Sequence, residues 1–204
     1  ASQGDTVAGS TSDSGPWLYQ LSSPTIITMD PYGYIYIMDY GNDRVQKWWP
    51  GAQYGSTVAA SSTLGNAYGL ALDPLGNIIV ADTTNARVVK FSLMCLASTT
   101  TTTAPPTQPT ISMCQTAAWN QSFSLAAGAT SSPGSIATLL NGPYDIAFDG
   151  YDNMYVVDIN NNRIQKFPYG TFTATTVAGF TLTAGSTRAQ LNTPTAIAVM
   201  NQLK

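Results

Sequence analysis

The chain carries a repeated pattern of hydrophobic and polar positions. Stretches 24–48, 67–91 and 143–167 align without a gap, and a partial copy covers residues 194–200. In each full copy a short apolar run ends at Asp, and a tight turn leads to a second apolar run. A polar turn then leads to a third run that ends in an aromatic residue. Short apolar runs separated by turn residues predict three β-strands per copy.

The turns and the flanking segments extend this prediction to four strands. Asp30 to Gly33 and Asp73 to Gly76 place Asp, Pro and Gly where a type I β-turn prefers them, whereas copy three has Asp149 to Asp152 without Pro. A fourth strand is expected after each third one, at residues 56–60, 122–127 and 175–179. We also expect a spare fourth strand at Thr6 to Gly9 and a lone first strand at Thr195 to Val199.

Four antiparallel strands per unit, repeated after about forty residues, are typical of β-propeller blades. The motifs P-x-x-I/L-A-x-D, G-N-I-x-V-A-D, N-x-R-V/I-x-K-F and T-V-A-G also resemble the NHL repeat. Over nearly the whole chain, this resemblance implies an all-β propeller that is incomplete within the chain, with about three blades and a strand at each end. It leaves the function open, because NHL-type propellers include RNA-binding modules, extracellular sensor domains and amidating lyases.

Composition and charge narrow the classes of function. Hydrophobic residues make up 44% of the chain, which favours one folded domain over residues 1–204. Only 9% of the residues are charged, the net charge is -3 and no basic run occurs, so a nucleic-acid partner is not expected. No apolar run approaches the roughly 20 residues that span a bilayer, so no membrane segment is expected. The chain begins without a signal-peptide pattern, as expected of a mature or excised segment.

One insertion breaks the repeat. Residues 95–114 lie between the third and fourth strands of copy two and are rich in Thr and Pro. Such tracts resemble O-glycosylated stalks, because they have little apolar surface to bury. A bare flexible linker is the alternative, and Asn120 begins the only N-glycosylation sequon of the chain. The residues expected to carry O-linked sugar are Thr99, Thr100, Thr101, Thr102 and Thr103.

The only two cysteines, Cys95 and Cys114, flank this insertion. If the third and fourth strands of the copy pair as a hairpin, both cysteines lie at the neck of the excursion, within disulfide reach. A bond that closes about 20 residues would contribute roughly 3 kcal/mol. It would also indicate an oxidising, extracellular location. Two buried free thiols are the alternative.

The acids and the missing residue types bear on catalysis. The chain contains no His, and its acids are all Asp, so Ser-His-Asp and zinc-hydrolase arrangements cannot form. The His metal ligands of the amidating lyases do not carry over either. Asp145 and Asp152 are unrepeated, but two acids make a poor calcium site. We therefore expect no catalytic residue, no metal and no cofactor.

Each full copy also carries an Asp five residues before an Arg. A catalytic residue would appear once, whereas these residues recur in every copy. We therefore interpret them as structural, with the Asp capping turn amides or pairing with the Arg. The pairs are Asp39 and Arg44, Asp82 and Arg87, and Asp158 and Arg163.

Three functions remain open at this point. We favour a non-catalytic extracellular scaffold that carries glycan and contacts other proteins or its own copies. Three blades alone would expose apolar faces that invite head-to-tail assembly or a filament, unless further blades of the same polypeptide close the propeller. A ligand- or carbohydrate-sensing ectodomain is the second function, and a metal-dependent hydrolase or lyase is the third. Aromatic residues in turns and at strand ends either pack between blades or contact proteins and glycans, and they are Trp17, Tyr19, Tyr32, Tyr40, Trp48, Trp49, Tyr54, Tyr151 and Tyr169.

Overall fold

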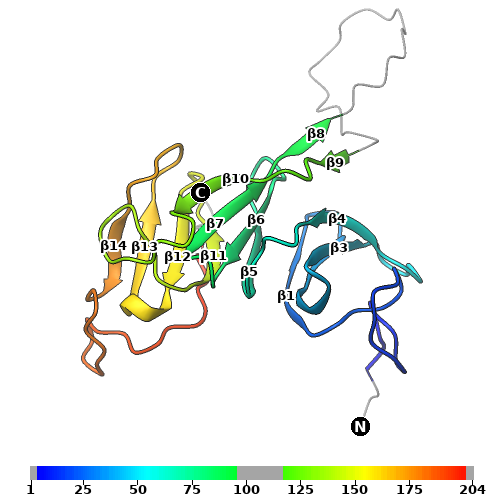
Figure 1. Ribbon diagram of the computed structural model, residues 1–204, viewed down its shortest axis with the longest axis horizontal. Coiled ribbons are helices and arrows are strands. Elements are labelled where there is room, and N and C mark those ends of the chain that lie inside the picture. The colour runs from blue at the N-terminus through cyan, green and yellow to red at the C-terminus, as the bar shows by residue number, and fades with distance from the viewer. Residues whose placement is uncertain (1–3, 96–116, 201–204) are drawn as a thin grey trace, which may run out of the picture.

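A computed structural model of the protein describes residues 4–95 and 117–200. They form three four-stranded antiparallel sheets (Figure 1), which we name blades one, two and three, so the all-β prediction is confirmed. Blade one contains β1 (Pro24–Met29), β2 (Ile35–Asp39), β3 (Arg44–Trp48) and β4 (Ser56–Ala60). Blade two contains β5 (Ala67–Leu72), β6 (Ile78–Asp82), β7 (Arg87–Phe91) and β10 (Ser124–Gly128). Blade three contains β11 (Pro143–Phe148), β12 (Met154–Asp158), β13 (Arg163–Phe167) and β14 (Thr175–Gly179).

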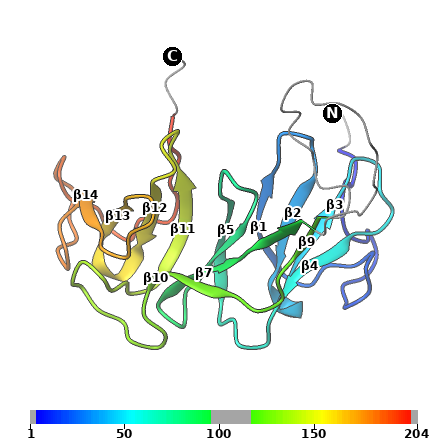
Figure 2. The ribbon, with the colours of Figure 1, turned by 90° about the horizontal axis from the view of Figure 1, so that it is seen from above.

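The first strands of the three blades lie next to one another (Figure 2), with β5 between β1 and β11. In each sheet the order runs outward from this first strand to the fourth. The backbones of β5 and β11 come so close that a Cβ added to Gly69 would lie 2.7 Å from the carbonyl oxygen of Tyr144. Glycine is therefore required at this junction, because only a residue without a side chain permits such an approach.

The turns follow the residue types that the sequence supplies. The amide of Gly33 donates to the carbonyl of Asp30, and the amide of Gly76 donates to the carbonyl of Asp73, as in a β-turn. Both glycines have a positive φ, of 85° and 80°. Blade three reaches the same conformation with Asp152, whose φ is 64°. Blades one and three then join their second and third strands through the 3-10 turns η1 (Tyr40–Asn42) and η2 (Ile159–Asn161).

The insertion lies between the third and fourth strands of blade two. Strand β10 pairs with β7 although the two are separated by the extra chain. Within the insertion, β8 (Leu93–Cys95) and β9 (Ala117–Trp119) pair as a two-stranded extension of the blade. Trp119 anchors this extension, because its ring is buried and its Nε1 donates to the carbonyl of Gly76. The extension is thereby attached to the turn that joins β5 and β6.

The hydrophobic core lies between the blades. One cluster joins blades one and two and includes Met38, Val80 and Phe91, and a second joins blades two and three and includes Ile79 and Val156. The second strand of blade two contributes alternate residues to the two clusters, because side chains alternate across a strand. This placement explains why the second apolar run of the copy has few polar positions.

The two lone strands expected at the chain ends are wrong. Residues 6–9 and 195–199 form no strand in the described part of the chain. A strand is stable only when a neighbouring strand satisfies its backbone, and no described strand pairs with either segment. The second segment is held differently, because the amide of Ile197 donates to Oδ2 of Asp145 over 2.9 Å. The helices among the described residues include none with the length and apolar character of a membrane span.

Candidate functional site

The repeated Asp and Arg residues form one buried ion pair in each blade. In every pair, Nε of the Arg lies 2.7 Å from Oδ2 of the Asp. The two residues face each other where the second strand ends and the third begins, as in the register of Asp158 with Arg163. All three Asp side chains are fully buried. A buried carboxylate needs several partners to offset its lost hydration, and each pair provides them.

These pairs connect each blade to the loop that enters it. Oδ1 of Asp158 accepts from the amide of Asn141 over 2.7 Å, and Oδ2 also accepts from the side chain of Asn161. Arg163 in turn donates to the carbonyls of Ser135 and Leu139. Asp39 and Asp82 accept from loop amides in the same way, those of Ser22 and Gly65.

The geometry gives these acids a structural role. Burial raises the pKa of Asp158, and the hydrogen bonds from Asn161, the Asn141 amide and Arg163 act in the opposite direction. The carboxylate oxygens already accept from these groups, so neither is directed at a substrate. Asp158 and its counterparts therefore clamp the entering loops.

A second repeated acid caps the first turn of each blade. Oδ1 of Asp149 accepts from the amides of Tyr151 and Asn153, and Oδ2 accepts from the hydroxyl of Tyr155. Burial alone would raise the pKa of Asp149, but the side-chain hydrogen bond from Asn153 and the other donors outweigh it and lower the pKa to about 2. Lys166 Nζ lies 3.8 Å from the same carboxylate. Asp30 and Asp73 cap their turns in the same manner.

The unrepeated acids do not gather into a cation site. Among the described residues, no three side chains of the metal-ligating types come together. Asp145 instead receives the amide of Ile197, so it holds the C-terminal segment against blade three. Asp152 lies at the tip of the β11–β12 turn, with its side chain half-buried.

Two aromatic arrangements cross the blade junctions, and the repeat pattern does not predict them. The rings of Tyr40, Tyr68 and Tyr144 stack in a row, with centroids 6.2 Å and 4.8 Å apart. The ammonium of Lys47 lies 4.0 Å from the ring centroid of Tyr34 and 5.3 Å from that of Trp119. The sequence contains one signal for the stack, which is a tyrosine at the second position of copies two and three. No sequence pattern predicts the contact between Lys47 and Trp119, because it joins blade one to the insertion.

The first strand of blade one leaves two large apolar side chains exposed. Ile27 and Met29 are 66% and 64% exposed. At the position of Ile27, Leu70 of blade two is 3% and Ile146 of blade three is 5% exposed. The latter two are buried in the clusters that join neighbouring blades. At Ile27 and Met29 blade one therefore has no neighbouring blade, and we call this exposed part of β1 the open face. The open face does not extend to β2, because Ile37, which pairs with Ile27, is only 3% exposed.

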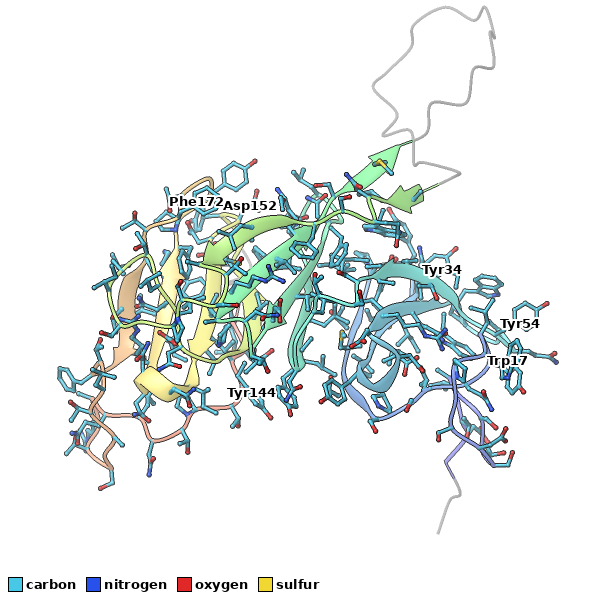
Figure 3. All side chains as sticks on the ribbon, in the orientation of Figure 1. Trp17, Tyr34, Tyr54, Tyr144, Asp152 and Phe172 are labelled. Carbon is cyan, nitrogen blue, oxygen red and sulfur yellow. The ribbon has the colours of Figure 1, made fainter. Side chains whose placement is uncertain are left out.

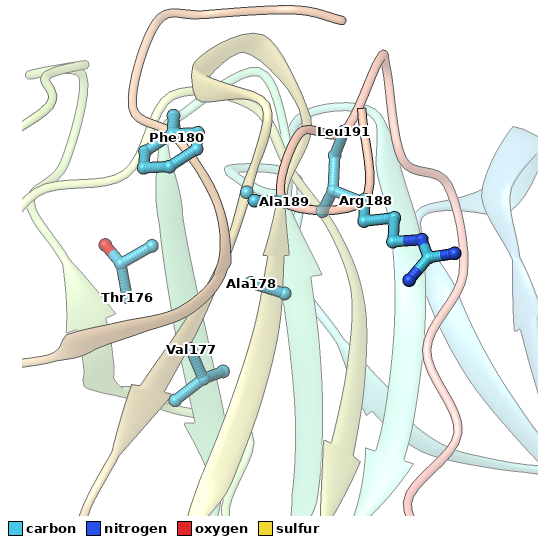
Figure 4. Close-up of a pocket in the computed structure, with 8 residues that line it drawn as sticks. Thr176, Val177, Ala178, Phe180, Arg188, Ala189 and Leu191 are labelled. Carbon is cyan, nitrogen blue, oxygen red and sulfur yellow. The ribbon is translucent and has the colours of Figure 1, made fainter. Parts of the chain in front are cut away.

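The outer edge of blade three carries a shallow hollow (Figure 4). It lies between β14 and the following loop, and Val177, Phe180, Arg188 and Leu191 are among its lining residues. The guanidinium of Arg188 is directed away from Phe180. Nothing in the hollow has the chemistry of an active site, because Arg188 is the only charged residue in its lining. The hollow is part of the exposed outer edge of blade three.

The aromatic residues predicted at turns and strand ends differ in burial. Trp48 is buried in blade one, whereas Trp17, Trp49 and Tyr54 are exposed. Asn120 is exposed and therefore accessible for modification. Its Oδ1 accepts from the amide of Ser122. Cys114 and Thr99–Thr103 lie outside the described residues, so the disulfide between Cys95 and Cys114 and the O-linked sugars stay predictions.

Known proteins share the repeat and the fold. A family model described as the NHL repeat matches residues 64–91, which contain the first three strands of blade two. Blades one and three repeat the same strand order and the same ion pair. An NHL repeat is therefore present in blade two, as the motifs predict, and blades one and three share its architecture. A search of curated proteins finds no match.

Solved structures agree with the fold at low sequence identity. An auxiliary nutrient binding protein from Bacteroides ovatus matches with a TM-score of 0.62 and 15% identity, over 94% of this chain and 50% of that chain. A structural genomics protein of unknown function from Bacteroides thetaiotaomicron matches with a TM-score of 0.63 and 16% identity, over 85% and 41%. Virginiamycin B lyase from Staphylococcus aureus matches with a TM-score of 0.50 and 12% identity, over 78% and 43%. These likenesses show the fold alone, and the chain spans half or less of each of these structures.

Proposed function

We propose that the protein is a non-catalytic extracellular interaction module that associates through the open face of blade one. The observation that carries this proposal is the exposure of Ile27 and Met29 where the equivalent residue Leu70 is buried. An exposed apolar face of this kind is typical of an interaction site. The repeat itself specifies its occupant, because blades two and three cover the same face with the preceding blade.

The occupant is a blade in a second copy of the chain, which contributes a face that is not packed against its own neighbouring blade. That contact joins two different faces, so it is heterologous, and it builds a ring or a filament according to whether the rotation closes. The matched propellers are about twice as long as this chain, which supports a need for further blades. Additional blades of the same polypeptide would fill the same face by the same contacts.

The absence of a catalytic role is part of the same proposal. The chain contains no His, and its repeated Asp residues are engaged in ion pairs or turn caps. The likeness to virginiamycin B lyase, at 12% identity, carries no reaction to this chain. An extracellular location follows from the predicted disulfide and O-linked sugars at the insertion, and mass mapping of natural material tests both.

The test compares the wild-type chain with the variant Ile27→Asp/Met29→Asp in light scattering at micromolar concentration. Charges on the open face would prevent docking, so the wild-type chain should be larger than the 21.6 kDa monomer and the variant should be monomeric. Ile136→Asp is the matched control, because Ile136 is 63% exposed but lies outside the open face. Equal masses for the wild type and the double variant would contradict the proposal.

A further inference from the structure

A second surface lies at one end of the blades. In an antiparallel sheet, the turn between strands one and two and the turn between strands three and four lie at the same end. Hydrogen bonds join these turns, from the amide of Leu93 to Asn77 Oδ1 over 2.8 Å and from the amide of Tyr169 to Asn153 Oδ1 over 3.3 Å. In Figure 3, Phe172 and Asp152 lie at the same edge of blade three and Tyr144 lies at the opposite edge.

This end carries three exposed aromatic rings in each of two blades. All six are between 46% and 70% exposed. We call them the turn-tip aromatics. They are Tyr32, Trp49 and Tyr54 in blade one, and Tyr151, Tyr169 and Phe172 in blade three.

The turn between the first and second strands does not require an aromatic residue. The third position of the turns, which Tyr32 and Tyr151 occupy, accepts most residue types. The turns are stabilised instead by the carboxylates of Asp30 and Asp149, which accept the backbone amides. Blade two folds in the same way with Leu75 at the corresponding position. Largely exposed aromatic rings at the tips of turns that Asp carboxylates already stabilise favour a binding role.

In blades one and three, which carry the turn-tip aromatics, the charges favour a neutral ligand. The ammonium of Lys47 lies over the ring of Tyr34, and that of Lys166 lies beside Asp149. Both cations are thus engaged within their own blades and are poorly placed to bind an anionic polymer. Asp152 remains at the rim next to Tyr151 as a hydrogen-bond acceptor.

We infer that the turn-tip aromatics bind a neutral oligosaccharide or polysaccharide. The face of an aromatic ring carries partial negative charge and attracts the weakly positive C–H groups of a sugar ring, and Tyr hydroxyls and Asp152 meet its hydroxyl groups. In each blade the three rings stand on two turns, and small or polar residues lie between the two rings that share a turn. A protein interface would instead have a continuous apolar core. Two clusters on one chain would also bind a long glycan more tightly than either alone.

The experiment measures binding of the full chain to neutral β-glucan, mannan and chitin oligosaccharides, with hyaluronan as an acidic comparison. We expect binding to at least one neutral glycan and at least a tenfold loss in the variants Tyr32→Ser/Trp49→Ser and Tyr151→Ser/Tyr169→Ser. Phe180→Ser is the control, because Phe180 is 55% exposed and follows the other end of β14. Thermal unfolding should be unchanged in the Tyr32→Ser/Trp49→Ser variant and in the control, since the substituted rings are exposed.

Three outcomes would overturn the inference. They are no binding to any neutral glycan, binding to hyaluronan alone, or equal loss in the Phe180→Ser control. Retention of a partner protein through the same residues, without glycan binding, would identify a protein interface instead. The proposed association through the open face is unaffected by these results, because Ile27 and Met29 are unchanged in every variant.

Discussion

Arg163 Nε lies 2.7 Å from Oδ2 of Asp158, and both side chains are almost fully removed from solvent. The same contact recurs between Asp39 and Arg44 and between Asp82 and Arg87. Each pair lies where the second strand turns into the third, and each holds the loop that enters its blade. The repeat is therefore held together by buried charge as well as by the apolar clusters between blades.

Removal of one partner of such a pair should be strongly destabilising. Arg163→Met leaves the buried carboxylate of Asp158 without its cation, and we expect a loss of about 3–5 kcal/mol in the free energy of unfolding. Lys166→Met is the matched control. Lys166 lies in the same strand but its ion pair is partly exposed, so we expect a loss below about 1 kcal/mol. Urea unfolding of both variants measures the difference, and similar losses would contradict a structural role for the pair.

Gly69 should tolerate no side chain. In Gly69→Ala the new Cβ would lie 2.7 Å from the Tyr144 carbonyl oxygen and 2.9 Å from Ala81 Cβ, so blades two and three would have to separate. We expect a loss of about 1–3 kcal/mol, as for other overpacked sites. Gly4→Ala is the control, because a Cβ added to Gly4 would have no atom within 4 Å. Thermal unfolding that is equally unaffected in both variants would show that the junction is looser than described.

Acid should weaken the turn of blade three through Asp149. Its folded pKa of about 2 lies below the ordinary value of 3.8, so its stabilising contribution is present above about pH 4 and is lost as the pH falls toward 2. The difference in unfolding free energy between the wild type and Asp149→Asn should therefore shrink over this range. A difference that is independent of pH would contradict the assigned hydrogen bonds.

Trp119 should anchor the insertion to the blades. Its ring is buried against blade one, 5.9 Å from the ring of Tyr36, and it lies near the ammonium of Lys47. Trp119→Ala should cost about 3–5 kcal/mol and speed proteolysis near β8 and β9. Met94→Ala, a 41% exposed residue of the same extension, serves as the control and should have little effect. Equal proteolysis of the two variants would show that Trp119 does not hold the extension.

The blades and their ion pairs could be predicted from the sequence because both are local. Arg44 follows Asp39 by five positions, and an antiparallel turn brings them opposite each other. The row of Tyr40, Tyr68 and Tyr144 could not be predicted, since it depends on how neighbouring blades are placed. The lone end strands were predicted wrongly for a related reason. Their apolar pattern is correct, but pairing needs a neighbouring strand that the pattern cannot supply.

The mass of the wild-type polypeptide in solution, without attached glycan, tests the open face most directly. Sedimentation equilibrium over a range of micromolar concentrations would measure it. If Ile27 and Met29 receive a blade of a second copy, the average mass should rise with concentration above the 21.6 kDa of one chain. A single species of 21.6 kDa at every concentration would contradict the proposal that this face docks another blade.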